Sequence, residues 1–433
     1  MKKISTMLLV LSLCLKATLG QTPVITMTTS KTVGSNFSFY LAANAGNNVT
    51  VDFGNGTQVP ETVGNTITIV SSTLVGSQTV KIYGTGITVL QCDTASLTAL
   101  DVSNATSLFY LSCFHNQLNA MDVTKNTALV YFYCSYNQLN ALNVSNNILL
   151  NELECSNNQL TVLDMSKNTA ITGLFCNNNR ISNLNLTNNT ALTWLWASNN
   201  QLTTLDVSRN TVLAKLYCEQ NQLNTLNVNN NSAFTIFTCW GNLLTFTSLP
   251  LKQSNWTTYT YAPQAPLNIV KAIGTGTNLD LSTQLTINGN TTVYTWKTKS
   301  GTTLIAGTDY TLTNGKTVFL KAPTDSVYCE MTNVTFPDFI GSNVLITTYT
   351  KVTATSATEE IKTDEPEIYC YNQTLHVNLT YNAQCSVFDV NGRLVVSTPL
   401  YSGANTMQLQ YSGVYLVKIT RNSNIVTRKI VVQ

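Results

Sequence analysis

Histidine and cysteine are the side chains best suited to catalysis or metal binding, and this sequence groups few of them together. The 433 residues include only two histidines, His115 and His376. Zinc sites and acid–base catalysis by histidine usually need such groups in defined clusters. The eleven cysteines show no CxxC or CxxH spacing, and no GxSxG nucleophile motif occurs. We therefore expect a non-enzymatic protein with no catalytic residue, no metal site and no cofactor.

Charge is scarce along the whole chain. Charged residues make up 10% of the sequence, and 23 Lys plus Arg against 21 Asp plus Glu leave a formal net charge of +2. An ordinary globular protein carries about 25% charged residues. A nucleic-acid-binding protein usually gathers Lys and Arg into a basic stripe, which this sequence lacks. We therefore expect no nucleic-acid partner.

The chain repeats itself with a period of 21 residues. Each unit should form one coil, in which both halves place alternate apolar residues inward and an Asn at the bend bonds backbone groups facing the next coil. Coils stacked at a strand spacing of about 4.8 Å would share a continuous core with two lines of parallel strands. Two of the repeating columns are Leu97, Leu118, Leu139, Leu160, Ile181, Leu202, Leu223 and Leu244, and Asn116, Asn137, Asn158, Asn179, Asn200, Asn221 and Asn242.

The repeat also matches a known family pattern. The stretch Leu108-x-x-Leu111-x-Cys113-x-x-Asn116-x-Leu118 fits the core consensus of leucine-rich repeats, with Cys in the third leucine slot. The segment from Ile87 to Pro250 resembles leucine-rich repeat proteins, and its nested form resembles a bacterial subclass with the pattern LxxLxCxxNxLxxLDVSxN. The resemblance implies a solenoid that presents one continuous strand face.

Seven of the eleven cysteines occupy one column of this repeat. They follow the same two-residue alternation as the inward-facing residues, so we interpret them as small core side chains rather than as a metal or redox ladder. Stacked side chains that project in the same direction also match disulfide geometry poorly. The column is Cys92, Cys113, Cys134, Cys155, Cys176, Cys218 and Cys239, with Ala197 in the one remaining place.

Acidic residues and asparagines share another column, and a Ser or Thr usually follows two positions later. Calcium binding is one interpretation, but no glycine–aspartate calcium loop is present. Bonding of these side chains to nearby backbone groups is the favoured interpretation. The column is Asp101, Asp122, Asn143, Asp164, Asn185, Asp206 and Asn227.

Aromatic residues accumulate at the outward positions around the first strand of each coil. Exposed rings on a rigid sheet can dock a protein partner or sugar rings. Neighbouring rings can equally stack along the sheet and stabilise it, and the two interpretations are compatible. The candidate ligand-binding residues are Tyr110, Phe114, Tyr131, Tyr133, Tyr136, Phe175, Trp194, Trp196, Tyr217 and Trp240.

The N-terminus has the layout of a secretory signal peptide. Lys2 and Lys3 precede an apolar run over 7–15, and we place cleavage after Gly20. A lipoprotein site at Cys14 is the less favoured alternative, because Leu before the Cys is too large for that pattern. No other segment offers 18 consecutive apolar residues, so we expect no transmembrane segment in the mature chain.

The segments that flank the repeat are expected to be β-rich. After the signal peptide (1–20), residues 21–86 should cap the first coil, and they weakly resemble a PKD-like module. The solenoid spans 87–250 and is followed by a linker over 251–265. Residues 266–353 resemble an immunoglobulin-like sandwich, with Trp296 in its core and no inter-sheet disulfide. A second linker covers 354–366, and residues 367–433 form a small β-sandwich.

This last sandwich carries three specific motifs. Their residues are Asp389, Asn391, Gly392, Arg393, Gly413, Val414, Tyr415 and Lys429. These motifs resemble the C-terminal sorting domain of the type IX secretion system of Bacteroidetes, although the usual Pro-Asn-Pro segment is replaced here by 367–371. The resemblance implies export, recognition by the outer-membrane secretion machinery, and release or attachment at the cell surface. Pairing of Cys370 with Cys385 stays open.

Together these observations predict a mainly β protein, secreted or attached to the outer-membrane surface. Its solenoid strand face would recognise an extracellular protein or glycan, as in an adhesion protein, with the immunoglobulin-like module as a spacer. A structural surface-layer component, or a protein inhibitor without a small-molecule ligand, is the alternative.

Overall fold

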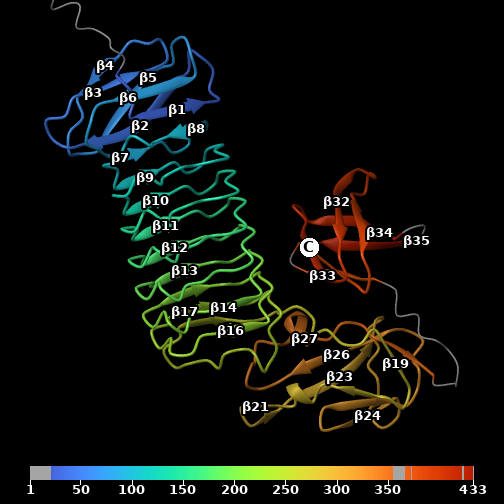
Figure 1. Cartoon of the computed structure of the whole chain (residues 1–433). Helices are drawn as coiled ribbons and strands as arrows, with labels where there is room; N and C mark the ends of the chain where they lie inside the picture. The colour runs from blue at the N-terminus through green and yellow to red at the C-terminus, as the bar shows by residue number, and fades with distance from the viewer. Residues whose placement is uncertain (1–20, 355–365, 372, 422–423, 433) are drawn as a thin grey trace, which may run out of the picture. The chain divides into compact units, whose positions relative to one another are not determined.

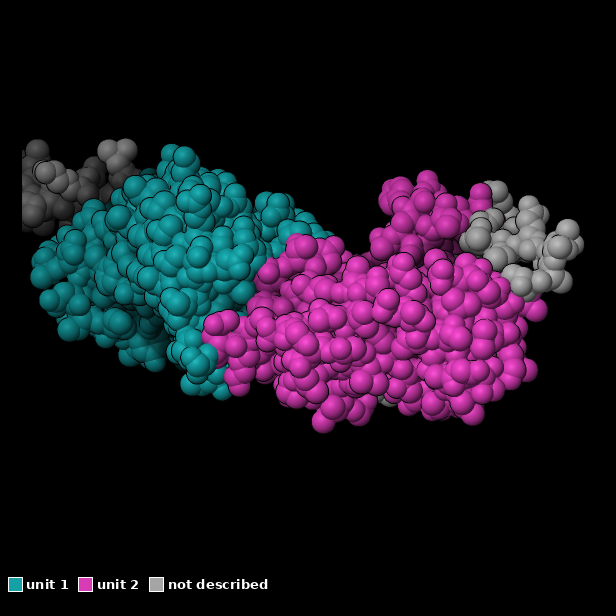
Figure 2. Space-filling view, turned by 90° about the horizontal axis from the view of Figure 1, so that it is seen from below, with its two compact units in different colours: residues 1–218, 227–237, 254–258 teal, residues 219–226, 238–253, 259–433 magenta. Residues whose placement is uncertain are grey.

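The computed structural model describes residues 21–354, 366–371, 373–421 and 424–432. Its regular elements are β-strands and two short 3₁₀ helices, η1 (Ser282–Gln284) and η2 (Gly341–Asn343). No helix in these described ranges is long and apolar enough to cross a membrane. The prediction of a mainly β fold is therefore confirmed. The chain divides into two compact units, the first made of Met1–Cys218, Asn227–Phe237 and Ser254–Thr258 and the second of Glu219–Leu226, Thr238–Gln253 and Tyr259–Gln433 (Figure 2).

The first unit begins with strands that cover the end of the solenoid. One sheet has the strand order β4-β3-β6-β1-β8, and β2 lies between β5 and β7 in a second sheet. Because β1 pairs with β8 and β2 pairs with β7, the backbone groups of the first coil find partners on both sides. The strands are β1 (Ile25–Thr29), β2 (Asn36–Ala43), β3 (Val49–Asp52), β4 (Val59–Glu61), β5 (Thr68–Thr73), β6 (Thr79–Tyr83), β7 (Ile87–Gln91) and β8 (Leu97–Asp101).

The first half of each coil contributes one short strand to a long sheet (Figure 1). Neighbouring strands pair in parallel and in register, so that residues 21 positions apart face each other, as Phe132 faces Leu153. The sheet order is β5-β2-β7-β9-β10-β11-β12-β13-β15-β17-β18. The coil strands are β9 (Tyr110–Ser112), β10 (Tyr131–Tyr133), β11 (Glu152–Glu154), β12 (Gly173–Phe175), β13 (Trp194–Trp196), β15 (Lys215–Tyr217), β17 (Ile236–Thr238) and β18 (Thr258–Thr260).

The second halves of most coils have no partner strand, so the expectation of a second continuous line of parallel strands was wrong. There, β8 pairs with β1, and β14 (Thr204–Asp206) and β16 (Thr225–Asn227) pair as a two-stranded sheet. A tight turn follows the second half in paired and unpaired coils alike, as Asn210 N–H donates to the Val207 carbonyl and Asn168 N–H to the Met165 carbonyl. The acidic column adds to this local bonding, because the Asp164 carboxylate accepts from Ser166 N–H at 2.9 Å. The preference for backbone bonding in this column is confirmed.

Apolar side chains and cysteines fill the inside of the coils. All seven cysteines of the column are fully buried, and none forms a disulfide. Burial raises the pKa of the Cys176 thiol to about 12, so this thiol stays protonated near neutral pH. A protonated thiol is a poor nucleophile and metal ligand. The interpretation of this column as core is confirmed.

Two columns of buried asparagines join each coil to the next. In the first column, Asn158 Oδ1 accepts from Leu139 N–H at 2.9 Å, and its amide nitrogen donates to the carbonyls of Cys134, Cys155 and Ser156 at 3.0 to 3.2 Å. In the second column, Asn168 donates to the carbonyls of Val144 and Asn147, while its Oδ1 is buried without a hydrogen bond among the described residues. The asparagine side chains therefore supply hydrogen-bond partners to backbone groups that the bends would otherwise leave unsatisfied.

One position in every coil has a left-handed backbone. Its φ lies between 52° and 68°, a conformation that strains most side chains and that Asn and Gly tolerate best. The turn presents its N–H to the next coil, as Asn157 N–H donates to the Asn177 carbonyl. The column is Thr94, His115, Tyr136, Asn157, Asn178, Asn199, Gln220 and Gly241.

The second unit contains a sandwich of two small sheets, β20-β25-β24 and β23-β26-β27. Trp296 is fully buried between them, donates from Nε1 to Thr317 Oγ1 at 3.0 Å and packs against the ring of Phe319. Cys329 is a buried thiol, so this core lacks a disulfide, as predicted. The strands are β19 (Ala272–Gly274), β20 (Asn278–Asp280), β21 (Thr286–Ile287), β22 (Asn290–Thr291), β23 (Val293–Thr298), β24 (Tyr310–Thr313), β25 (Lys316–Phe319), β26 (Val327–Thr332), β27 (Leu345–Ile346) and β28 (Lys351–Thr353).

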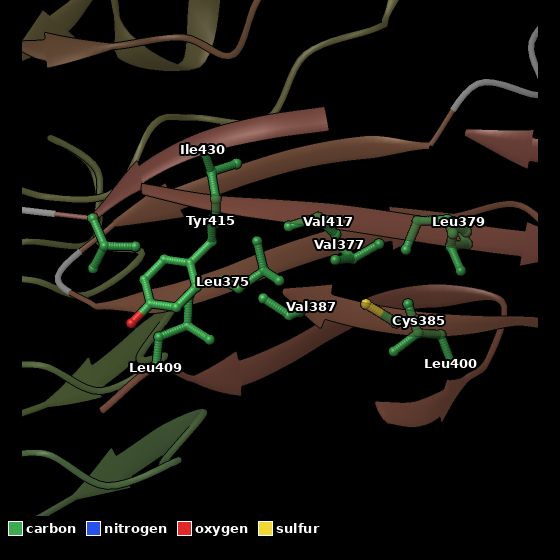
Figure 3. Close-up of a cluster of buried hydrophobic side chains, with 12 residues drawn as sticks. Leu375, Val377, Leu379, Cys385, Val387, Leu400, Leu409, Tyr415, Val417 and Ile430 are labelled. Atoms are coloured by element: carbon green, nitrogen blue, oxygen red, sulfur yellow. The ribbon is translucent and has the colours of Figure 1, made fainter. Parts of the chain in front are cut away.

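The C-terminal segment forms another small sandwich, from sheets β29-β30-β33 and β32-β31-β34-β35. Its core gathers apolar side chains from both sheets, including Leu375, Val387 and Tyr415 (Figure 3). Cys370 and Cys385 are both free thiols. The strands are β29 (Glu367–Tyr371), β30 (Thr374–Leu379), β31 (Ala383–Phe388), β32 (Leu394–Leu400), β33 (Gly403–Gln408), β34 (Gly413–Arg421) and β35 (Asn424–Val432).

Candidate binding face and sorting domain

The outward side chains of the coil strands form two rows across the sheet, because the central residue of each strand points inward. Parallel pairing in register places each outward residue beside its counterpart on the next strand. We call this surface the strand face. The first row is Tyr110, Tyr131, Glu152, Gly173, Trp194 and Lys215, and the second is Ser112, Tyr133, Glu154, Phe175, Trp196 and Tyr217.

Seven of the ten predicted ligand-binding aromatics belong to these two rows. The other three, Phe114, Tyr136 and Trp240, follow the strands. Only Phe114, Tyr136 and Trp196 are exposed, at 37%, 47% and 38%. The other seven are half-buried, because neighbouring side chains cover one another. The expectation that all ten are exposed was therefore wrong, although each keeps part of its surface in contact with solvent.

Ring contacts divide the rows into two aromatic groups. Tyr110 lies 6.1 Å from Tyr131 and 5.4 Å from Tyr133, measured between ring centroids. On the other side of β11, Phe175 meets Trp194 edge-on at 5.0 Å, and Trp196 lies 5.4 Å from Tyr217. Ring pairs at such distances stabilise each other and lose little mobility when a ligand binds.

Two carboxylates lie between the aromatic groups. Glu152 and Glu154 are the outward residues of β11, and both are half-buried. The Tyr133 hydroxyl donates to Glu152 Oε1 at 3.0 Å. Burial, with the nearby Glu152 carboxylate, raises the pKa of Tyr133, which therefore stays neutral and keeps its proton for this bond. Within the described part of the chain, neither glutamate forms an ion pair.

Sequence reasoning missed one exposed aromatic residue beside this face. His115 stacks on Tyr136 at 4.3 Å and meets Phe114 edge-on at 5.2 Å. Both His115 and Tyr136 occupy the left-handed column, where three later coils place Asn. The sequence contained a signal for this residue: His115 and Tyr136 are bulky, and they occupy a column in which the backbone favours Asn or Gly.

The predicted secretion motif begins with a tight turn between β31 and β32. Asp389 Oδ1 accepts from the N–H groups of Asn391 and Arg393 at 2.9 and 3.0 Å, and Arg393 Nε lies 3.3 Å from Asp389 Oδ2. The backbone N–H of Arg393 holds the pKa of Asp389 below its usual value. Gly392 has a φ of 76°, which explains the glycine at this place in the turn.

The second motif, at β34, has one inward and one outward side. Tyr415 is buried, and its hydroxyl donates to the Tyr411 carbonyl at 2.9 Å. A pocket of about 460 Å³ is lined by turn residues together with Val414, Tyr415, Leu416, Lys418 and Lys429. The turn residues that line it are Phe388, Asp389, Val390 and Gly392. Asp389, Gly392, Val414 and Lys429 therefore share one surface, which Phe388, Leu416 and Lys418 complete without having been predicted.

The described residues contain no group of three or more His, Cys, Asp or Glu side chains arranged to hold a metal ion. His376, the second histidine, lies in β30 and stacks on Tyr369 at 4.8 Å with nearly parallel rings. Burial lowers the pKa of His376 to about 4.

The lowered pKa of His376 predicts that the sorting domain loses stability in acid. Unfolded histidine titrates near pH 6.5, so the unfolded chain binds a proton below about that pH while the folded domain does not. The stabilisation is complete above about pH 6.5 and is lost as the pH falls toward about 4. We expect the unfolding temperature to decline over this window, measured by circular dichroism. His376→Phe keeps a ring against Tyr369 and should decline less, whereas equal declines would contradict the assignment.

Comparison with known proteins places a family domain at the C-terminus. Residues 371–433 match the model of the secretion system C-terminal sorting domain. A comparison with curated proteins finds no significant match.

Several solved structures are similar to parts of the chain. An internalin of Listeria monocytogenes has 25% identity over 37% of this chain and 50% of its own, with a TM-score of 0.33. The functional domain of InlJ from L. monocytogenes, which includes a cysteine ladder, has 21% identity over 62% of this chain and 82% of its own, with a TM-score of 0.28. YopM, a leucine-rich effector of Yersinia pestis, has 23% identity over 38% and 52%, with a TM-score of 0.32. The chain spans about half the length of the internalin and of YopM.

The 21-residue coils, the in-register parallel strands and the asparagine columns define a β-solenoid of the leucine-rich repeat type. Beside this solenoid the chain carries, over residues 371–433, a secretion system C-terminal sorting domain. This domain directs secretion and attachment at the cell surface.

Proposed function

We propose that this surface protein binds an extracellular protein or glycan through the strand face and carries out no catalysis. The observation that supports the proposal best is the pair of aromatic groups on one rigid sheet. Their rings come from strands that parallel pairing holds in register, so ordering them costs little conformational entropy on binding. Aromatic side chains of this kind dominate the energetics of many protein interfaces and also stack on sugars.

The other parts of the chain receive supporting roles in this proposal. Residues 21–86 cap the solenoid, 266–353 act as a spacer, and 367–433 carry the export signal. The shared surface of Asp389, Gly392, Val414 and Lys429 is the part that the outer-membrane secretion machinery would contact. A layer component or an inhibitor would use the same scaffold, but a layer component would assemble with itself.

The proposal is tested by removing the two tryptophans of β13 from the mature chain. Trp194→Ala combined with Trp196→Ala should weaken saturable binding to the matching member of a panel of purified matrix proteins and glycans by at least about tenfold. Binding is measured by surface plasmon resonance. The control, Val162→Ala combined with Thr204→Ala, changes exposed positions on the second halves of the coils and should bind normally. Unchanged capture by a folded tryptophan variant would refute the proposal.

A further inference from the structure

The strand face has an uneven distribution of charge. Its two rows contain Glu152 and Glu154 side by side on β11, and their only cationic side chain is Lys215 on β15. β12 and β13 lie between β11 and β15. Within the described part of the chain, Lys215 forms no ion pair with either carboxylate.

Lys215 has a different partner on the same face. Its ammonium nitrogen lies 4.1 Å from the ring centroid of Trp194, in the geometry of a cation–π contact. The face thus already holds one ammonium group on an aromatic ring. The two glutamates remain without a cation in the described part of the chain.

Aromatic side chains flank the two glutamates on both sides. In register, Glu154 pairs with Tyr133 on β10 and with Phe175 on β12. Gly173 has no side chain, and a Cβ built there would lie 3.2 Å from both the Phe175 ring and Glu152 Cγ. The Phe175 ring therefore fills the space above Gly173 and forms a wall beside Glu152. On the opposite side, the Tyr133 hydroxyl holds the Glu152 carboxylate in place.

This arrangement suits one kind of occupant. A lone carboxylate pair at a solvated surface attracts cations only weakly, but rings on both sides remove water and add cation–π attraction. An Arg or Lys side chain matches both parts, because its charged end can meet the carboxylates while its methylene groups pack on the rings.

We propose that Glu152 and Glu154, between Tyr133 and Phe175, form the seat of a basic side chain from a protein partner. This inference rests on the proposed function and narrows its ligand to a protein segment that presents Arg or Lys. The two carboxylates provide charge complementarity, and the surrounding aromatic groups provide the contact area.

The seat is tested on the whole mature chain with a dye-labelled hexa-arginine peptide and fluorescence anisotropy. We expect saturable binding that Glu152→Gln combined with Glu154→Gln weakens by about tenfold or more. Raising NaCl from about 50 to about 300 mM should weaken it too, since exposed charges are screened. The matched control is Asp164→Asn combined with Asp206→Asn, which removes the same charge from a column that already holds Asn143 and Asn185. This control should bind within about twofold of the unmodified chain.

Several results would overturn the seat. Equal affinity of the glutamine variant and the control would do so, as would equal binding of hexaglutamate. Binding of a glucosamine hexamer without binding of hexa-arginine would replace the protein partner with an amino sugar. If the double tryptophan substitution weakens capture of the panel ligand but the double glutamate substitution does not, the seat is overturned and the proposed function stands. If neither double substitution weakens capture, the seat and the proposed function are both overturned.

Discussion

Replacing Asn158 with alanine should lower the free energy of unfolding of the solenoid by about 3–5 kcal/mol. The side chain accepts one hydrogen bond and serves three carbonyl groups, which belong to two neighbouring coils. Alanine leaves these backbone groups buried in a space that has no substitute partner. Each such group costs about 1–3 kcal/mol when it stays unsatisfied, and partial relaxation limits the sum. Asn158→Asp should be no milder, because a carboxylate cannot donate to the three carbonyls.

The measurement is urea denaturation of the full chain followed by circular dichroism. Asn168→Ala provides the matched comparison, since it removes another buried asparagine, 0% exposed against 9% for Asn158, that serves two carbonyls and whose oxygen has no hydrogen bond among the described residues. Its effect should be smaller, about 2–3 kcal/mol. An Asn158→Ala loss below that of Asn168→Ala would contradict the hydrogen-bond account of the first column.

Removing residues 367–433 should abolish delivery of the protein to the cell surface. The matched sorting domain occupies 371–433, and its β34 and β35 pair along nine positions to form one side of the sandwich. Without this segment the secretion machinery has no folded domain to recognise. The truncated chain should therefore accumulate in the periplasm. Protease treatment of intact cells, followed by fractionation, measures the distribution.

The control for this truncation is the full chain with Trp194→Ala and Trp196→Ala. It changes the strand face and leaves the sorting domain intact, so it should reach the surface as the unmodified chain does. Normal surface exposure of the truncated chain would refute the role given to residues 367–433.

The regular part of the molecule was predictable because stacking repeats the same physical demand in every coil. A buried bend needs a donor and an acceptor at the same place each time, so Asn recurs at 137, 158 and 179 and its bonding to adjacent coils could be inferred. The inward cysteines followed from alternation in the same way, whereas the buried Trp296 was expected from the resemblance to an immunoglobulin-like sandwich.

The part of the fold that was mispredicted is the second half of the coils. These segments alternate like strands, and their Asp or Asn side chains accept from the backbone N–H two positions later, as Asp164 accepts from Ser166. The same bond occurs at Asp206, at the end of the paired strand β14, so it is compatible with a ladder as well as with an unpaired segment. Two-residue periodicity alone does not distinguish the two outcomes.

The sequence predicted which residues lie on the candidate binding face, but not which of them contact one another. Period and alternation placed the aromatic residues on one surface, but their mutual coverage depends on rotamers that no pattern contains. The ring of Phe175 leans over Gly173, and the Lys215 ammonium lies over the ring of Trp194 on the neighbouring strand. Contacts such as these decide which charges stay available to a ligand.

The asparagine bonds between coils also bear on how such a chain can change in length. Every coil presents the same donors and acceptors to the next, so a duplication or loss of 21 residues preserves the inward and outward position of every remaining side chain. An insertion of one residue within a coil strand turns the rest of that strand's side chains to the opposite face. The strand face can therefore grow or shrink across generations by whole coils, each adding about 4.8 Å, while the core stays unaltered.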